Sequence, residues 1–436
     1  MNINASKVKD SLSHHILADG MDMIFDEEKS EGSCFVDKRD GRKFVDLFSF
    51  FASSPVGFNH HRIREASDKL GKIAKHKPTL SDVYTDTFAE FVETFSNFGI
   101  PEELQHAFFI EGGALGVENA LKAAFDWKVR KNLAKGKGEK GSKVIHFKNA
   151  FHGRTGYTLS LTNTGEHKIM YFPKFDWPRI SAPAIQFPLE DNEEQIIAAE
   201  NKSLEEIKSA LSQNPDDIAA LIIEPIQSEG GDNHFRGEFL AELRTLADES
   251  EFMLIFDEVQ TGVGLTGKFW AYENSDTIPD MISFGKKMQV CGFLAGKRLD
   301  EVEDNVFQSS GRINSTFGGN IVDMARTSIY LNIIKDENLL QNAETVGNHL
   351  LYRIQALQDE FNGFVSNARG KGLLCAFDLP TAKERDDIVN KIIENGAIIL
   401  GCGERTIRFR PSLTISTDDI DKGIDCIEKS LKSHYS

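Results

Sequence analysis

Short apolar runs alternate with longer stretches of helical spacing through the middle of this chain, and this alternation constrains its fold more than any other feature. Apolar runs bounded by turn residues are typical of buried strands, whereas apolar residues three or four positions apart are typical of helices. We expect strands at residues 106–110, 143–147, 219–224, 252–257 and 281–284, and helices at 115–129 and 237–250. Strands that alternate with helices predict an α/β fold built on a mostly parallel sheet with helices on both faces.

Residues that can bind a ligand or take part in catalysis stand where the expected strands end. The end segments are 111–114 (EGGA), 151–154 (FHGR), 224–225 (EP), 257–260 (DEVQ) and 285–287 (GKK). In open α/β sheets, ligands bind beyond the carboxyl ends of the strands. A purely structural sheet has no need of glycine, arginine, acid and lysine at these points, so the sequence predicts a binding site there.

The composition indicates a folded chain with an acidic surface. The 436 residues are 40% hydrophobic and 27% charged, which suffices for a large core and excludes general disorder. The formal net charge is −17. We therefore expect no nucleic-acid partner, which would need a basic face, and no binding to anionic membranes.

The cysteines and histidines predict neither disulfides nor a metal site. The five cysteines are scattered, and no two are spaced as C-x-x-C. No secretory signal and no apolar run of membrane-spanning length is visible, so we expect a cytoplasmic protein. The adjacent pairs His14-His15 and His60-His61 do not share a helix face, and we expect them to be solvated and to bind no metal.

A glycine-rich segment at residues 262–268 matches two nucleotide-binding patterns incompletely. GVGLTG fits G-x-G-x-x-G, but the acidic DEVQ separates it from the preceding strand, and the residues after it do not resemble a helix. As a P-loop it has Phe269 where Ser or Thr must meet Mg²⁺. We predict a loop here and keep a nucleotide-binding ATPase as the alternative class of protein.

Asp257 and the Lys286-Lys287 pair, at the ends of two expected strands, favour pyridoxal phosphate chemistry. That cofactor needs a lysine for its Schiff base and an acid that keeps its pyridine nitrogen protonated. Gly112-Gly113-Ala114 lies between a strand and a helix, where backbone N–H groups suit a phosphate. Charge alone does not distinguish Lys286 from Lys287.

Four sequence blocks resemble the class III pyridoxal-phosphate aminotransferases: 223–231 (IEPIQSEGG), 256–262 (FDEVQTG), 284–287 (FGKK) and 407–411 (IRFRP). They occur in the family's order, and the resemblance runs from about residue 48 to near the C-terminus. It implies a fold type I transferase, with a seven-stranded sheet in a large domain at residues 62–323. Residues 1–61 and 324–436 would form a smaller α+β domain, and two copies would form a homodimer with the active site at the subunit interface.

Two kinds of family member compete for the amino donor. Segments 224–234 and 151–157 suit both, whereas 48–58, 111–118, 286–291 and 312–320 resemble the members that act on the ε-amine of L-lysine. The favoured reaction transfers that amine to 2-oxoglutarate, giving glutamate and 2-aminoadipate 6-semialdehyde, which cyclises to piperideine-6-carboxylate. The alternative donor is 4-aminobutyrate or another ω-amino acid.

The resemblance also implies roles around the cofactor ring. Lys286, by the family's G-K placement, would form the Schiff base and shuttle the proton, and Asp257 would hold the ring nitrogen. Gln260 would reach the ring hydroxyl and border the substrate. Val259 and Phe151 would enclose the ring, one on each face.

Further residues would hold the phosphate and the substrate. Gly113 and Ala114 would donate backbone N–H groups to the phosphate. Thr316 would reach it from the second subunit, with Asn314 nearby at the substrate.

The resemblance assigns two arginines to substrate carboxylates. Arg154 would bind the distant carboxylate of lysine and the distal one of 2-oxoglutarate. Arg408 would bind the carboxylate beside the keto carbon, and Glu229 would pair with Arg408 while lysine is bound. The plain alternatives are that Arg154 supports the phosphate loop and that Glu229 and Arg408 form a surface ion pair worth little.

Overall fold

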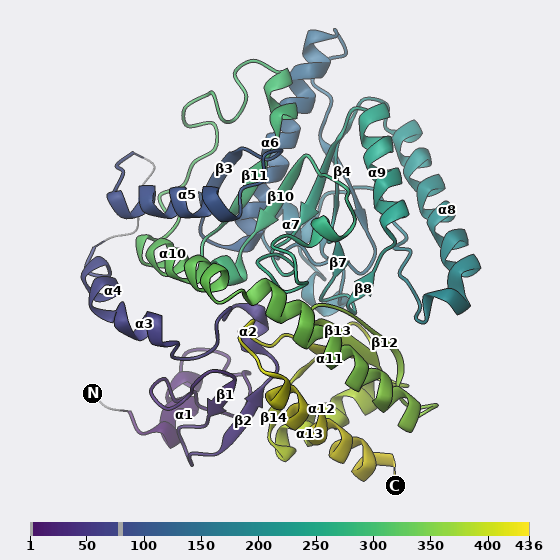
Figure 1. The fold of residues 1–436 in the computed structure, drawn as a ribbon. Coiled ribbons are helices and arrows are strands. Elements are labelled where there is room, and N and C mark those ends of the chain that lie inside the picture. The colour runs from purple at the N-terminus through teal and green to yellow at the C-terminus, as the bar shows by residue number, and fades with distance from the viewer. Residues whose placement is uncertain (1–2, 77–81, 436) are drawn as a thin grey trace.

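A seven-stranded sheet forms the centre of the computed structural model, which describes residues 3–76 and 82–435 (Figure 1). In spatial order its strands are β3 (His106–Ile110), β11 (Cys291–Ala295), β10 (Met281–Phe284), β9 (Met253–Asp257), β6 (Ile218–Ile223), β4 (Lys143–Phe147) and β5 (Arg179–Ile180). Only β11 runs antiparallel to its neighbours. The predicted mostly parallel sheet is confirmed, and the five predicted strands are found with ends shifted by no more than one residue.

Helices cover both faces of this sheet. Helix α6 (Gly113–Ala134) packs on one face, against β11, β6 and β10. Its close approach depends on Gly116, because a Cβ there would lie 2.7 Å from the carbonyl oxygen of Gly292 on β11. The second face is covered by helices that include α5 (Asp86–Phe98) and α9 (Gly237–Glu249), whose buried Phe95 and Leu243 belong to the largest apolar core.

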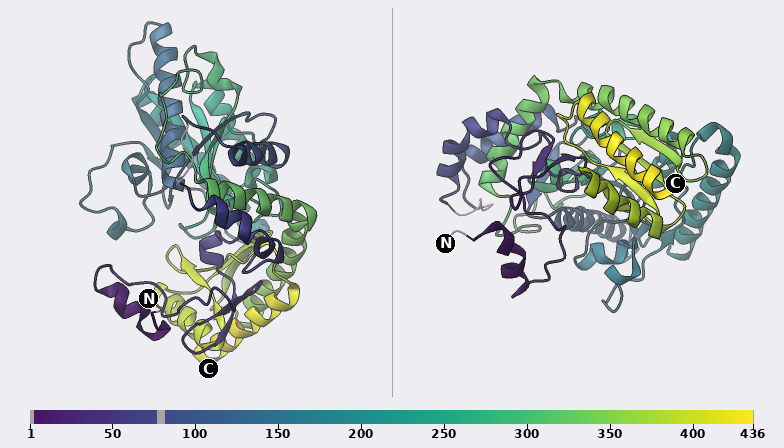
Figure 2. Two further views of the ribbon diagram at one scale, coloured as in Figure 1. Left: turned by 90° about the vertical axis from the view of Figure 1, so that its left-hand side faces the viewer. Right: turned by 90° about the horizontal axis from the view of Figure 1, so that it is seen from below.

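The N-terminal and C-terminal parts of the chain pack together beneath this sheet (Figures 1 and 2). The parallel pairing of β2 (Lys43–Asp46) with β14 (Ala397–Ile398) joins them in a three-stranded sheet completed by β1 (Cys34–Val36). A four-stranded sheet lies beside it, in the order β12 (Ser366–Lys371), β13 (Leu374–Asp378), β16 (Thr406–Phe409) and β15 (Leu400–Cys402). Helices α11 (Leu339–Glu360), α12 (Ala382–Asn395) and α13 (Thr417–Tyr435) pack around these sheets.

The described residues form further helices and strands. They are η1 (Ala5–Lys7), α1 (Val8–Ser13), α2 (Ser49–Ala52), α3 (His61–Glu65), α4 (Ser67–Ile73), α7 (Gly156–Leu161), η2 (Glu166–Lys168), α8 (Leu189–Gln213), β7 (Ile226–Gln227), β8 (Asn233–His234), η3 (Ala271–Asn274), η4 (Lys286–Met288), η5 (Lys297–Glu301) and α10 (Ile321–Asp336).

The glycine-rich segment 262–268 is a series of turns after β9, as predicted, and a short 3-10 helix comes after it at Ala271–Asn274. The strand–turn–helix unit that both nucleotide-binding patterns require is therefore not formed there.

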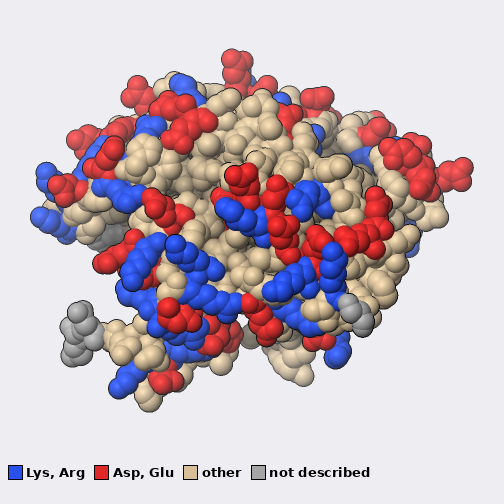
Figure 3. Space-filling model, turned by 60° about the horizontal axis from the view of Figure 1, so that its bottom comes forward, with Lys and Arg blue, Asp and Glu red and all other residues tan. Residues whose placement is uncertain are grey.

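The surface carries charges of both signs. On the face seen from below, Lys and Arg side chains gather in patches separated by acidic and uncharged residues (Figure 3). No helix of the described residues combines the length and the apolar character needed to cross a bilayer.

Candidate active site

A cavity of about 380 Å³ lies where the carboxyl ends of β3, β4, β6, β9 and β10 meet. Nine of the predicted site residues line it: Gly113, Ala114, Phe151, Arg154, Glu229, Asp257, Val259, Gln260 and Lys286. Four residues that the sequence analysis did not assign to the site also line it: Phe51, His152, Gly153 and Glu224. The structure thus gathers segments from five separate strand ends around one space.

Lys286 and Lys287 occupy different environments although they are adjacent. Lys286 lines the cavity, and burial, followed by the charges of Arg408 and Arg410, lowers the pKa of its amine to about 8. Its backbone φ of +48° lies in the left-handed region, which is uncommon for a residue other than glycine. The side chain of Gln289 holds this turn by donating to the carbonyl oxygens of Lys286 (2.9 Å) and Ser53 (2.8 Å).

The amine of Lys287 is turned into the protein interior. Its Nζ donates to the backbone carbonyls of Gln260 (2.9 Å) and Ala52 (3.5 Å), and burial lowers its pKa well below the ordinary value. This geometry favours Lys286 as the residue available to a ligand in the cavity.

Ala52 ends a left-handed turn, α2, in which all four residues have positive φ. Left-handed turns are costly for residues with a Cβ, so neighbouring groups must hold this one. The buried carboxylate of Asp46 accepts N–H groups of Phe48 (2.9 Å) and Ser49 (2.8 Å) at its start, and Lys287 binds its last carbonyl. The turn places Phe51 in the cavity wall.

Asp257, at the end of β9, is a buried carboxylate with three donors. Ser283 Oγ (3.0 Å) and the Val259 N–H (3.1 Å) donate to Oδ1, and His152 Nδ1 lies 2.7 Å from Oδ2. Nε2 of His152 is buried without a hydrogen-bond partner in the part of the chain that the structure describes. His152 and Ser283 were missed from the sequence, although His152 stands inside the strand-end segment 151–154.

A second buried carboxylate, Glu224, lies beside this group. Its oxygens accept the N–H groups of Phe151 (2.9 Å) and Ser228 (3.0 Å). Burial raises the pKa of Glu224 to about 7, opposed by His152 and reinforced by Asp257. Glu224 therefore fixes the backbone of Phe151 at the cavity wall.

The turn before α6 is built to receive an anion. Gly112 has a φ of +94°, which suits glycine, and the 22-residue helix starts at Gly113 with no acidic residue in its first turn. The positive end of the helix dipole and the first N–H groups of α6 lie at the cavity, which Gly113 and Ala114 line. A Cβ on Gly113 would lie 3.0 Å from Val259 Cγ1, so glycine also allows Val259 to approach.

Gln260 is oriented by two arginines. Its Oε1 accepts from Arg410 Nε (2.9 Å) and lies 3.5 Å from Arg408 Nη1, which leaves its amide N–H groups for a ligand. Arg410 is itself fixed by a buried ion pair with Asp232, in which Nη1 lies 2.9 Å from Oδ2. Arg410 was not predicted as a site residue, and no signal in the sequence indicated its pairing with Asp232.

Glu229 binds two cations at the cavity edge. Its Oε2 lies 2.8 Å from Arg408 Nη2, and its Oε1 lies 2.8 Å from Lys168 Nζ. Although burial raises its pKa, the charges of Arg408 and Lys168 bring the net pKa of Glu229 below its ordinary value. The Arg408 side chain is only 2% exposed, so the pair with Glu229 is not a surface ion pair.

Arg154 is exposed at the edge of the cavity and forms no ion pair with the residues at 3–76 and 82–435. Its guanidinium carbon lies 5.8 Å from the ring centre of Phe151, and Lys168 Nζ lies 5.7 Å from the same centre. These cation–π contacts place positive charge beside the aromatic wall.

Thr316 and Asn314 are not brought into this cavity. Both are exposed, in the loop between η5 and α10. The loop is held at the end of β3, where the Phe317 carbonyl accepts the Glu111 N–H (3.0 Å). Their predicted roles require a second subunit and stay predictions.

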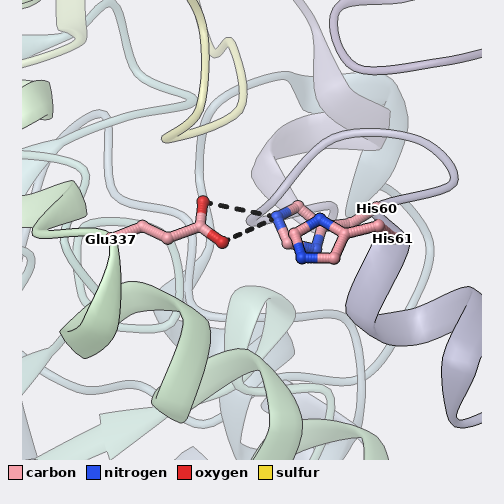
Figure 4. A group of neighbouring side chains, drawn as sticks. All are labelled: His60, His61 and Glu337. Carbon is pink, nitrogen blue, oxygen red and sulfur yellow. Dashed lines mark hydrogen bonds and ion pairs between the residues drawn. The ribbon is translucent and has the colours of Figure 1, made fainter.

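The expectation that His60 is solvated is wrong. His60 and His61 lie with their ring centres 4.5 Å apart, near Glu337 after α10 (Figure 4). The His60 side chain is 11% exposed, because its Nδ1 accepts the Arg62 N–H at the start of α3 while its Nε2 lies 3.1 Å from Glu337. His60 thereby joins α3 to the end of α10, whereas His14, His15 and His61 are exposed as expected.

Comparison with known proteins shows the family to which this chain belongs. The family model for class-III aminotransferases matches residues 16–431, so the chain belongs to that family. Membership implies pyridoxal 5'-phosphate as the cofactor.

Several similar proteins of this family are named L-lysine-epsilon aminotransferases. The chain is 48% identical to the L-lysine-epsilon aminotransferase of Mycobacterium tuberculosis, over 98% of this chain and 95% of the relative, and 44% identical to that of Amycolatopsis lactamdurans, over 99% and 96%. A solved structure of lysine aminotransferase from M. tuberculosis in the internal aldimine form superposes with a TM-score of 0.97, at 47% identity, over 99% of this chain and 100% of that chain. The 4-aminobutyrate aminotransferase of Kluyveromyces lactis is 34% identical, over 94% and 90%.

Proposed function

We propose that this chain transfers the ε-amino group of L-lysine to 2-oxoglutarate. The products are glutamate and 2-aminoadipate 6-semialdehyde, whose aldehyde cyclises with its own α-amine to piperideine-6-carboxylate. The observation that carries the proposal is the pair of arginines at the cavity. Arg154 is open to a carboxylate far from the reacting end, while Arg408 is occupied by Glu229. The higher identity to lysine enzymes than to 4-aminobutyrate enzymes supports the same choice.

The residues around the cavity fit the cofactor. Bound pyridoxal phosphate supplies an aldehyde that condenses with amines and a cationic ring that accepts the electrons left when a carbon–hydrogen bond breaks. Asp257 would hold the ring nitrogen, and Val259 and Phe151 would cover the two ring faces; all three line the cavity. The N–H groups of Gly113 and Ala114 at the start of α6 would bind the phosphate.

The protein residues would perform the remaining work. The amine of Lys286, with its lowered pKa, can act as a nucleophile, and it would afterwards carry the proton lost by the reacting substrate carbon to the aldehyde carbon of the cofactor. Gln260, fixed by Arg410, would donate its amide N–H to the ring hydroxyl. The carboxylate of Asp257 stays oriented because three donors hold it.

The two arginines would distinguish the half-reactions. Lysine has no carboxylate next to its reacting carbon, so Arg408 can stay paired with Glu229 while Arg154 binds the distant carboxylate. The keto acid brings a carboxylate next to its keto carbon, and Glu229 would leave Arg408 to that group.

We propose the same division into domains that the resemblance implies. Residues 62–323 would form the large domain, and residues 1–61 with 324–436 the small domain that closes over the substrate. The pairing of β2 with β14 supports this grouping of the two ends of the chain.

The assembly we propose is a homodimer in the cytoplasm. Thr316 and Asn314 are exposed and do not line their own cavity, which supports their completing the cavity of a second copy. All five cysteines are free thiols, as expected for a reducing compartment.

An amino-donor panel tests the proposal. The purified protein is supplied with 2-oxoglutarate and either L-lysine, 4-aminobutyrate or L-ornithine, and glutamate is measured. We expect the highest kcat/KM with lysine. Turnover with 4-aminobutyrate and none with lysine would assign the chain to the other donor.

Replacing Arg154 with methionine is expected to raise the KM for lysine by about 10- to 100-fold, because a charge-assisted, bidentate contact to the distant carboxylate is lost. Arg154→Lys, which keeps the charge but not the fork, should give an intermediate value. An unchanged KM for lysine would show that Arg154 does not bind the carboxylate and would leave it the role of supporting the phosphate loop.

The lowered pKa of Lys286 predicts how capture of the cofactor by the apoprotein depends on pH. Only the unprotonated amine attacks an aldehyde, so the rate should rise about tenfold per pH unit below about 8 and level off above it. The rate can be followed by the visible absorbance of the bound cofactor. A midpoint near the ordinary lysine pKa of 10.5 would show that burial does not lower the pKa of Lys286.

A further inference from the structure

Lys168 is the third charged member of the group that it forms with Glu229 and Arg408, and neither the strand-end pattern nor the resemblance assigned it a role. It ends the short 3-10 helix η2 (Glu166–Lys168), outside the strand ends, and its side chain is 15% exposed. Its Nζ lies 2.8 Å from Glu229 Oε1, whereas Arg408 contacts the other oxygen of that carboxylate, Oε2. The only other hydrogen bond of this amine within the described residues is a long one, 3.4 Å, to Thr164 Oγ1.

We propose that Lys168 is a positioning residue, which holds the Glu229 carboxylate in place when Arg408 is released to the keto acid. The inference rests on the proposed function, in which a substrate carboxylate replaces Glu229 at Arg408. If Arg408 were the only cationic partner of Glu229, its release would leave a half-buried carboxylate unpaired. That state is costly, because little water can replace the lost partner. With Lys168 attached to Oε1, Glu229 retains one charged partner after Oε2 leaves Arg408.

The charges of the three side chains support this role. Lys168, Glu229 and Arg408 together carry one net positive charge, so an incoming carboxylate neutralises the group. Without Lys168 the remaining pair is already neutral and attracts an anion less. Both effects act in the same direction and weaken binding of the keto acid.

Arg408 also has capacity for a second anion. Its Nε is buried without a partner in the described part of the chain, and its Nη1 makes only the 3.5 Å contact to Gln260. Glu229 thus occupies one of its nitrogens, Nη2. A carboxylate can approach the guanidinium while Glu229 turns towards Lys168.

The lysine half-reaction should not depend on Lys168 in this way. Lysine leaves Glu229 between its two cations, since it has no carboxylate beside the reacting carbon. Lys168 therefore affects the acceptor more than the donor, and this selectivity distinguishes a positioning residue from a structural one.

The test compares Lys168→Met and Lys168→Arg with Lys174→Met. Lys174 is a matched control, because it lies six positions further on and, within the described residues, its amine donates only to the backbone carbonyls of Ile169 and Phe172. Each holoenzyme is assayed for its KM for lysine and its KM for the keto acid, and the Kd for glutarate, an unreactive dicarboxylate, is measured by calorimetry.

For Lys168→Met we expect the KM for the keto acid and the Kd for glutarate to rise about tenfold, with the KM for lysine changed by no more than about twofold. Lys168→Arg should restore both values, and Lys174→Met should match the unaltered protein. Three results would overturn the proposal: unchanged glutarate binding, an equal rise for both substrates, or a rise for lysine alone.

Arg408→Met separates this inference from the proposed function. If Arg408→Met does not weaken glutarate binding, the keto-acid site itself is wrongly placed. If Arg408→Met weakens it and Lys168→Met does not, only the role of Lys168 is wrong.

Discussion

The Lys286→Ala protein is expected to lose turnover by at least ~10⁴-fold, because one amine serves both as the attachment point of the cofactor and as the proton shuttle. The alanine variant should bind pyridoxal phosphate only reversibly. After borohydride reduction, peptide mass spectrometry should find no cofactor mass on the peptide that contains position 286, whereas the unaltered protein carries it at Lys286.

Lys287→Met is the matched control for this experiment. It removes an adjacent amine that points away from the cavity, so the cofactor mass should remain at Lys286. Because Lys287 supports the left-handed turn at Ala52, this variant should be less stable, by about 1–3 kcal/mol for the buried carbonyls left unpaired. Labelled Lys287 in the Lys286→Ala protein, with activity retained, would reverse the assignment of the two lysines.

Asp257→Asn is the second variant for which we expect a large effect, a loss of ~10³-fold or more in kcat from the missing charge opposite the ring nitrogen. Asparagine has nearly the shape of aspartate but cannot keep a proton on that nitrogen. In the variant, the side-chain NH₂ group would also face a group that donates a hydrogen bond to the carboxylate of the unaltered protein: His152, Ser283 or the Val259 N–H. Two donors would then face each other, so a hydrogen bond is lost together with the charge. Circular dichroism should show a folded protein.

Ser283→Ala gives the comparison for Asp257→Asn. It removes one of three hydrogen bonds to the carboxylate and leaves the charge, so we expect a decrease in kcat of about tenfold or less. Full activity of Asp257→Asn would show that Asp257 does not act on the ring nitrogen.

Most strands of the central sheet were predictable because their residues are largely buried. Strands β3, β4 and β10 have the expected ends, since each is a short apolar run closed by glycine or charged residues. The antiparallel strand β11 (CGFLA) was not expected, because its pairing with β3 and β10 is set by the turn after Lys286 rather than by its own pattern.

Some residues of the cavity and its surroundings could be predicted from the sequence, and others could not. Gly113, Asp257 and Lys286 stand directly at strand ends, so the sheet rule places them together without any knowledge of distant contacts. Arg410 and Lys168 act through partners far away in the chain, Asp232 and Glu229, and only the folded structure brings these charges together. His60 was misjudged for the same reason, because its partner Glu337 lies across a helix junction.

Transfer of nitrogen from position-specifically labelled lysine tests the central claim most directly. The holoenzyme is incubated with 2-oxoglutarate and lysine carrying ¹⁵N at either the ε- or the α-amine, and the glutamate formed is analysed by mass spectrometry. We predict that glutamate acquires ¹⁵N from ε-labelled lysine and none from α-labelled lysine. Label derived from the α-amine, or no glutamate from either lysine while 4-aminobutyrate is consumed, would contradict the proposed reaction.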